Sequence, residues 1–163
     1  MADPMDAPMQ QLTQLYRELG PLLLAYFRHQ RPLAAAADDL LQDTFVRAAR
    51  NPERLQRSES PRAYLFGIAR HVGLDALRRH RPETEEFADC ATETATEDAR
   101  LEPMRAAIAA LPALHREPLL LKLHQELNYA EIAEVLGVPV GTVRSRLHHA
   151  VRQLRDSLNP PAP

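Results

Sequence analysis

The sequence predicts an all-α protein built of two small helical domains that are joined by an acidic flexible linker. Apolar residues recur at three- and four-residue intervals in two separate blocks of the 163-residue chain. Between the blocks, residues 83–102 hold eight acidic side chains and one basic one, are rich in Thr and show no apolar periodicity. A chain of this length has room for two small domains, which we place at 9–82 and 104–158, with the linker at 83–103.

Composition narrows the class of protein. No run near 18 apolar residues occurs, which excludes membrane insertion, and residues 1–11 lack the pattern of a signal peptide, which predicts a cytoplasmic protein. The single cysteine, Cys90, cannot form an internal disulfide. No Cys or carboxylate completes a metal-ligand spacing with the histidines, so we expect neither a metal nor a cofactor.

The net charge of −2 hides two mildly basic blocks, with 12 basic and 9 acidic residues over 1–82 and 7 and 5 over 103–163. All of the 20 basic residues except Lys122 are Arg. Arginine suits bidentate contacts with phosphate or guanine, although a high-GC genome would give the same bias.

The first half predicts three helical segments. Residues 12–27 carry an apolar stripe that is interrupted by a Gly-Pro pair, which predicts two short helices or one sharply bent helix. An Arg-Pro pair marks a break, and the strongest helix signal follows over 34–50. Its apolar face holds Leu41, Phe45 and Ala48. Its charged face, spaced for Asp-to-Arg pairing along the helix, is of the kind that is usually solvated and holds Asp39, Asp43, Arg47 and Arg50.

A polar loop is expected over 51–59, and then Ser60 and Pro61 supply a cap and a first-turn proline for a helix that ends near His80. The apolar side of this helix is predicted to be Tyr64, Leu65, Ile68, Val72 and Leu77. Its cations, which also compensate the helix dipole, are Arg62, Arg70, Arg78, Arg79 and Arg81.

The second half predicts two helices, over 104–111 and 114–126, followed by a helix-turn-helix over 128–155. Asn128 can cap the first helix of that motif, Gly137 can end it in a left-handed conformation, and Pro139 can start the second helix after a turn of three or four residues. The core positions expected in the preceding helices are Leu119, Leu120, Leu123 and Leu127.

In the helix-turn-helix, Ile132, Ala133, Val135 and Leu136 form the apolar stripe of the first helix, while Val143, Leu147, Val151 and Leu154 form that of the second. The outward face of the second helix is cationic and polar, with Arg144, Ser145, His148, His149 and Arg152. By spacing alone, a DNA-reading pair and an ordinary pair of packed helices are equally open.

The motif GTVRSRL, after an apolar-Gly-apolar-Pro turn, resembles the recognition helix of the carboxy-terminal domain of sigma-70-family sigma factors, and LPALHREPLLLKLHQELNYAEIAEVLGV is similar to the same region. The resemblance implies that the second helix enters the major groove of the minus-thirty-five promoter element. The residues that it assigns to this contact are Thr142, Arg144, Ser145, Arg146, His148, His149 and Arg152.

Two motifs of the first half resemble domain two of the same family. DDLLQDTFVR is similar to the helix that holds the clamp helices of RNA polymerase, which implies docking by Asp38, Asp39, Gln42, Asp43 and Arg47. SPRAYLFGIARHVGLDALRRH resembles the segment that captures the unwound minus-ten element, which implies DNA contacts by Arg62, Tyr64, Arg70, His71, Arg78 and Arg79. The chain departs from this pattern at His71, where these proteins commonly carry Asn.

The resemblance covers 12–158 and has the layout of an extracytoplasmic-function (ECF) sigma factor. It implies a specificity subunit without catalytic residues, whose partners are core RNA polymerase, promoter DNA and an anti-sigma factor. The linker could reach roughly 70 Å; it would thread the nucleic-acid channel of the polymerase or serve as an unengaged acidic spacer.

Two other classes compete with this interpretation. A helix-turn-helix repressor or activator would need only the second domain and leaves DDLLQDTFVR unexplained. A sigma-like decoy for an anti-sigma factor would keep the fold without the DNA contacts, which the Arg144 and Arg146 pair argues against. An enzyme is not expected, because no catalytic triad, Gly-rich phosphate loop or metal spacing occurs.

Overall fold

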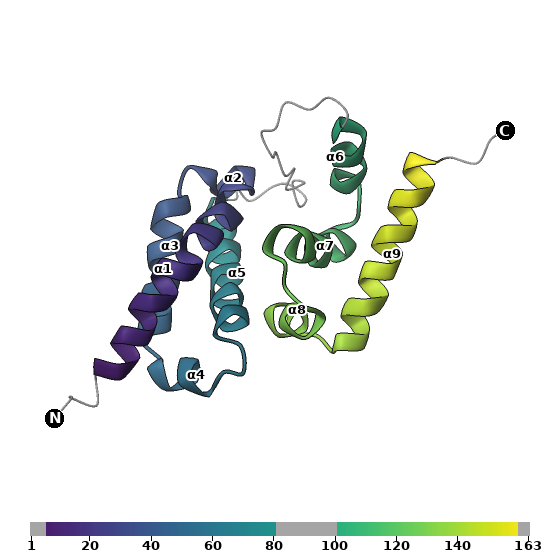
Figure 1. The fold of residues 1–163 in the computed structure, drawn as a ribbon. Coiled ribbons are helices and arrows are strands. Elements are labelled where there is room, and N and C mark those ends of the chain that lie inside the picture. Colours follow the sequence, from purple (N-terminus) through teal and green to yellow (C-terminus); the bar gives the residue numbers. More distant parts are fainter. Residues whose placement is uncertain (1–5, 81–100, 160–163) are drawn as a thin grey trace. The chain divides into compact units, whose positions relative to one another are not determined.

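The computed structural model describes residues 6–80 and 101–159, and the chain divides near residue 85 into two compact units (Figure 1). Over the described residues the regular elements are helices and no strand occurs, which confirms the all-α prediction with two helical domains. The segment expected to be the flexible linker lies largely outside the described residues, as do Arg81 and Cys90.

Unit 1 is a bundle of three long helices, α1 (Asp6–Arg28), α3 (Ala37–Ala49) and α5 (Pro61–Arg79), which pack pairwise. Two short helices, α2 (Arg31–Ala34) and α4 (Pro52–Arg57), close opposite ends of the bundle (Figure 1). Phe27 of α1 and Phe66 of α5 are fully buried, and the Tyr26 ring meets both edge-on at centroid distances of 5.4 and 5.8 Å. Aromatic packing of this kind holds α1 against α5.

Of the two arrangements predicted for the amino end, two short helices or one sharply bent helix, the first is wrong, because α1 continues through Pro21 as one helix. A proline inside a helix removes one backbone hydrogen bond. Leu19, Leu23 and Phe27 are buried on both sides of it, and this burial keeps the helix continuous.

The break and the polar loop that the sequence suggested are in fact the short helices α2 and α4. Each has a proline in its first turn and buries a single leucine, Leu33 or Leu55, each at 2% exposure. One apolar residue is too few to give a periodic signal.

The start of α5 confirms the predicted cap: Ser60 Oγ accepts a hydrogen bond of 3.1 Å from the Ala63 N–H, and Pro61 follows. The predicted apolar face is only partly correct. Leu65 and Val72 are buried, but Tyr64, Ile68 and Leu77 are half-buried. The buried face is completed by smaller residues and Phe66, namely Ala63, Phe66, Ala69, Gly73 and Ala76.

Unit 2 consists of α6 (Glu102–Ala109), α7 (Ala113–Gln125), α8 (Tyr129–Leu136) and α9 (Val140–Leu158), and α9 packs on the other three. Helix α6 begins at Glu102, so the last two residues of the segment expected as linker are helical. The buried Arg116 of α7 donates from Nη1 to the Ala109 carbonyl at 2.6 Å and so holds the end of α6.

The core predicted for α7 and the residues just after it contains an error. Leu119 and Leu127 are buried and Leu120 is half-buried, as the pattern allows, but Leu123 is 57% exposed and Leu121 is buried instead. Leu119, Leu120, Leu121 and Leu123 crowd one short run, so the sequence does not decide which of them faces inward.

The helix-turn-helix is confirmed. Asn128 Oδ1 accepts from the Glu131 N–H and Glu131 Oε2 accepts from the Asn128 N–H, both at 2.9 Å, which is a reciprocal capping box. Gly137 ends α8 with φ of 64°, and the turn runs over 137–139. Ile132, Ala133 and Val135 are buried as predicted.

In α9 the predicted inward position of Val151 is wrong, since this residue is 48% exposed and Ala150 is fully buried. Eight residues of an α-helix turn the chain about 80° past a starting position, whereas seven residues fall about 20° short of it. Measured from the buried Val143, Ala150 therefore faces the core and Val151 does not.

We expect fragments 1–82 and 101–163 each to fold alone, because each unit buries its own core, around Phe27 and Phe66 in the first and Ile132 and Val143 in the second. Circular dichroism should show cooperative thermal melting for each fragment. A fragment that starts at 103 lacks the first residue of α6 and should melt earlier than 101–163. Loss of cooperative melting in either of the first two fragments would show that the units need each other.

The ends of α7 and α8 allow a paired stability prediction. Both Glu126 (φ of 52°) and Gly137 (φ of 64°) are left-handed, a conformation that costs a residue with a Cβ roughly 1 kcal/mol or more. We expect Gly137→Ala to lower the free energy of unfolding by about 1 kcal/mol and Glu126→Gly to raise it by up to about 1 kcal/mol. Urea denaturation of the 101–163 fragment measures both, and equal signs for the two variants would contradict the argument.

Candidate polymerase and nucleic-acid interfaces

One face of α3 carries exposed polar side chains that make no hydrogen bond or ion pair among the described residues. Asp39, Gln42 and Asp43 are exposed and follow at helical spacing, and none of them has a hydrogen bond or ion pair among the described residues. The opposite face is packed into unit 1, since α3 buries Ala37, Leu40, Leu41, Thr44, Phe45 and Ala48. The helix is thus fixed by its core side while the polar side, which we call the α3 surface, stays open to a partner.

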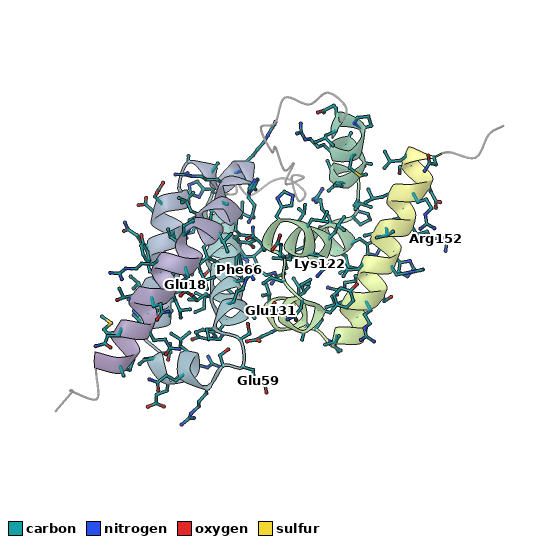
Figure 2. All side chains as sticks on the ribbon, viewed as in Figure 1. Glu18, Glu59, Phe66, Lys122, Glu131 and Arg152 are labelled. Atoms are coloured by element: carbon teal, nitrogen blue, oxygen red, sulfur yellow. The ribbon has the colours of Figure 1, made fainter. Side chains whose placement is uncertain are left out.

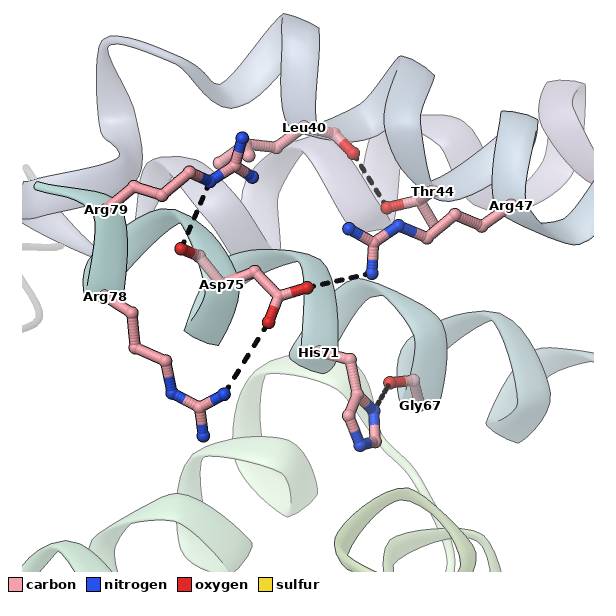
Figure 3. Close-up of polar contacts among 8 residues, drawn as sticks. All are labelled: Leu40, Thr44, Arg47, Gly67, His71, Asp75, Arg78 and Arg79. Atoms are coloured by element: carbon pink, nitrogen blue, oxygen red, sulfur yellow. Dashed lines mark hydrogen bonds and ion pairs between the residues drawn. The ribbon is translucent and has the colours of Figure 1, made fainter.

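The residues at the ends of the α3 surface are already paired. Asp38 Oδ2 lies 3.5 Å from Arg28 Nη2 of α1, and both side chains are more than half exposed. The pairing of Arg47 along its own helix is not found. Its Nη1 instead bonds Asp75 Oδ2 of α5 at 3.1 Å (Figure 3), because a half-buried partner on a packed neighbour is better screened from water than an exposed Asp43.

The predicted minus-ten residues lie on different sides of α5. At about 100° per residue, Tyr64, His71 and Arg78 follow at seven-residue steps along one side, and Arg79 lies on the flank of that side, about 80° from His71. Arg62 lies about 180° from His71, on the opposite side, and Arg70 lies about 100° from His71, on the other flank from Arg79; both are half-buried. We call the side with Tyr64, His71, Arg78 and Arg79 the α5 surface.

The α5 surface contains a carboxylate that the sequence did not single out. Asp75 Oδ1 lies 3.7 Å from Arg78 Nη1, and the Asp75 backbone carbonyl accepts a hydrogen bond from Arg79 Nε at 3.3 Å (Figure 3). The His71 ring donates from Nδ1 to the Gly67 carbonyl at 2.8 Å, so Nε2 is the ring nitrogen that this bond leaves unused.

The outward face of α9 agrees with the prediction. Arg144, Ser145, His148, His149 and Arg152 are exposed, and Thr142 and Arg146 are half-buried at its margins. Arg152 projects from α9 away from α7 (Figure 2). The cations therefore lie on the face that the packed core does not use.

Three imidazoles gather beside that face. His115 of α7 stacks on His149 with 5.6 Å between ring centroids and 18° between ring planes, and His148 meets His149 edge-on at 6.0 Å. His115 Nδ1 donates to Gln153 Oε1 at 3.0 Å. His115 and Gln153 were not predicted, because a contact between residues 38 apart in sequence has no local signal. Within 6–80 and 101–159, no group of three or more His, Cys, Asp or Glu residues is arranged to hold a metal ion.

A further cation lies at the start of α8. Lys122 Nζ of α7 (Figure 2) lies 5.8 Å from the centroid of the Tyr129 ring. This is within the range of a cation–π contact. It joins the end of α7 to the first helix of the helix-turn-helix.

A capped helix, a three-residue turn and a second helix with an exposed cationic face define unit 2 as a DNA-binding domain of the helix-turn-helix class. Both units match models of known protein families. The model of Sigma-70 region 2 matches residues 15–83, and that of Sigma-70, region 4 matches residues 101–154.

Full-length relatives agree with the family models. The RNA polymerase sigma factor HrpL of Pseudomonas syringae pv. syringae is 32% identical over 91% of this chain and 88% of its own. The ECF RNA polymerase sigma factor SigL of Mycobacterium tuberculosis is 35% identical over 88% of this chain and 86% of its own.

Solved structures share the fold. CnrH, in complex with the cytosolic domain of CnrY, has a TM-score of 0.66 and 26% identity, with 94% of this chain and 91% of that chain covered. The sigma factor RpoE from Bartonella quintana, in complex with the anti-sigma factor NepR, has a TM-score of 0.63 and 24% identity, with 91% and 99% covered.

The chain belongs to the sigma-70 family of RNA polymerase sigma factors, and within it to the ECF sigma factors. It directs promoter-specific transcription initiation, and its two regions have core RNA polymerase and promoter DNA as their partners. Sigma factors are non-catalytic specificity subunits. In the described part of the chain, none of the helices combines the length and the apolar character that a membrane crossing requires.

Proposed function

We propose that the α3 surface is where this sigma factor docks on core RNA polymerase. Asp39, Gln42 and Asp43 form its centre, with Asp38 and Arg47 at its ends. The observation that supports this is the contrast within one helix, which buries one side completely and leaves three polar side chains on the other without any partner among the described residues. Desolvating such groups is unfavourable unless a partner supplies opposite charges and donors.

The α5 surface would hold the unwound minus-ten strand. Tyr64 offers a ring for base stacking, His71 a ring and the nitrogen Nε2, and Arg78 and Arg79 charge for the backbone. Arg62 on the opposite side of α5 and Arg70 on its flank belong to this contact only if the strand wraps around the helix. The two functional domains would span residues 9–82 and 104–158.

The outward face of α9 would read the minus-thirty-five element in the major groove. Arg144 and Ser145 lie near the amino end of the helix, followed by His148, His149 and Arg152. Thr142 and Arg146 at the margins would contact the backbone. A groove-bound helix of this class contacts bases with its amino-terminal residues and phosphates further along.

We propose further that an anti-sigma factor regulates this sigma factor. We also propose that the sigma factor itself acts in the cytoplasm and has no catalytic activity of its own. Support for the regulator comes from two proteins of the same fold: RpoE was solved with the anti-sigma factor NepR, and CnrH, which is 26% identical to this chain, was solved with the cytosolic domain of CnrY. A purified complex with a protein encoded beside this chain would test it.

Run-off transcription tests the main proposal. Core polymerase with the full chain, on a library of genomic fragments, should initiate at a small set of promoters that core alone does not use. A helix-turn-helix repressor or activator would bind fragments without adding any initiation by core polymerase. A decoy for an anti-sigma factor would neither bind nor initiate.

A further inference from the structure

Asp75 connects the helix proposed to dock on polymerase with the helix proposed to hold DNA. Its Oδ2 bonds Arg47 of α3 at 3.1 Å, and its Oδ1 lies 3.7 Å from Arg78 of α5 (Figure 3). Its backbone carbonyl accepts from Arg79 Nε. One aspartate thus contacts three arginines, two of which belong to the α5 surface.

The two ion pairs differ in strength. The Arg47 and Asp75 side chains are 38% and 40% exposed, and their bond is short, so this pair is partly shielded from water. Arg78 is 79% exposed and its distance to Asp75 is longer, so water and salt weaken this pair. Arg47 therefore fixes the carboxylate in place, while Arg78 can exchange Asp75 for a DNA phosphate.

A fixed carboxylate among the cations also opposes DNA. It repels the backbone and competes with phosphate for Arg78, and both effects lower the attraction of α5 for any strand regardless of its sequence. Base stacking on Tyr64 and contacts of His71 do not depend on this charge. A carboxylate at this place therefore raises the share of binding that depends on sequence.

We propose that Asp75 is a positioning residue for minus-ten capture, anchored by Arg47, that restrains Arg78 and suppresses sequence-independent binding of single-stranded DNA. This rests on the proposed function of the α5 surface. If Asp75 served only to hold α3 against α5, its removal should weaken DNA binding. The inference instead predicts that its removal tightens non-specific DNA binding, even though the two helices lose a contact.

The test uses holoenzyme and two fluorescent single-stranded 12-mers, the non-template strand across the minus-ten element of a promoter found by run-off transcription and a scrambled strand of equal composition. Asp75→Asn should bind the scrambled strand roughly threefold to fivefold more tightly, with a salt slope steeper by about 0.7, as expected for one additional phosphate contact. The preference for the promoter strand should fall. Asp75→Glu, which keeps the charge, should return towards wild type.

Two matched variants isolate the cause. Glu53→Gln removes a carboxylate that pairs with Arg57 at 3.9 Å on α4, so it changes the net charge equally without removing a contact of Asp75, and it should leave both strands unaffected. In an Arg78→Gln background, Asp75→Asn should no longer tighten binding by the same factor, because the restrained cation is gone.

Three results would overturn the inference: weaker binding of both strands by Asp75→Asn together with a lower melting temperature, an equal gain from Glu53→Gln, or an undiminished gain in the Arg78→Gln background. The failure of the proposed function looks different. In that case wild-type holoenzyme itself binds the promoter and scrambled strands alike, and the role of Asp75 fails with it.

Discussion

Replacing Asp39 and Asp43 together with arginine is expected to abolish association with core RNA polymerase while unit 1 stays folded. Both carboxylates are exposed and without partners among the described residues, so their replacement leaves the buried side of α3 intact. At an interface built for negative charge, two like-charge contacts cost several kcal/mol, so affinity should fall by at least about a hundredfold. Co-purification with core and fluorescence anisotropy measure the loss, and circular dichroism checks the fold.

The control moves the same charge change elsewhere on unit 1. Glu18 on α1 and Glu59 before α5 are exposed (Figure 2), so Glu18→Arg with Glu59→Arg alters the net charge equally without touching the α3 surface. This variant should still bind core. A folded Asp39→Arg, Asp43→Arg protein that co-purifies with core at wild-type level would show that polymerase docks elsewhere.

The parts of the fold that the sequence predicts well are those specified by neighbouring residues. The Ser60 cap, the Asn128 and Glu131 box and the left-handed Gly137 each depend on a few consecutive positions, and all are confirmed. The α2 and α4 helices were missed because each is anchored by one leucine, and a single contact made at a distance along the chain leaves no periodic pattern.

The candidate sites divide in the same way. Exposure of Asp39, Gln42 and Arg144 follows from helix phase, so the sequence could place them. The ion-pair partner of Arg47 could not be predicted from the sequence. Asp43 is near it along the chain and Asp75 is distant, and only the packing of α3 on α5 decides between them. The stacking of His115 on His149 likewise depends on packing of α7 on α9.

Loss of Arg144 and loss of Arg152 are expected to impair promoter binding in different ways. Arg144 is exposed one position after the buried Val143, close to the amino end of α9, where a recognition helix meets base edges. A guanidinium there can bond guanine with two N–H groups, which contributes about 1 to 3 kcal/mol of discrimination. Arg144→Ala should therefore relax preference at one or two base pairs of the minus-thirty-five element.

Arg152 lies two turns further along α9, where a groove-bound helix leaves the bases and passes the phosphate backbone. Arg152→Ala should weaken binding to all sequences alike and reduce the slope of log affinity against log salt by about one unit. Arg155 is a further exposed arginine in the last turn, so Arg155→Ala serves as the matched control and should change affinity less.

Binding of holoenzyme to promoters with single base substitutions, measured across salt concentrations, separates the three variants. If Arg144→Ala lowers affinity uniformly and keeps the base preference, the amino end of α9 does not point at the bases and the placement of the recognition helix is wrong.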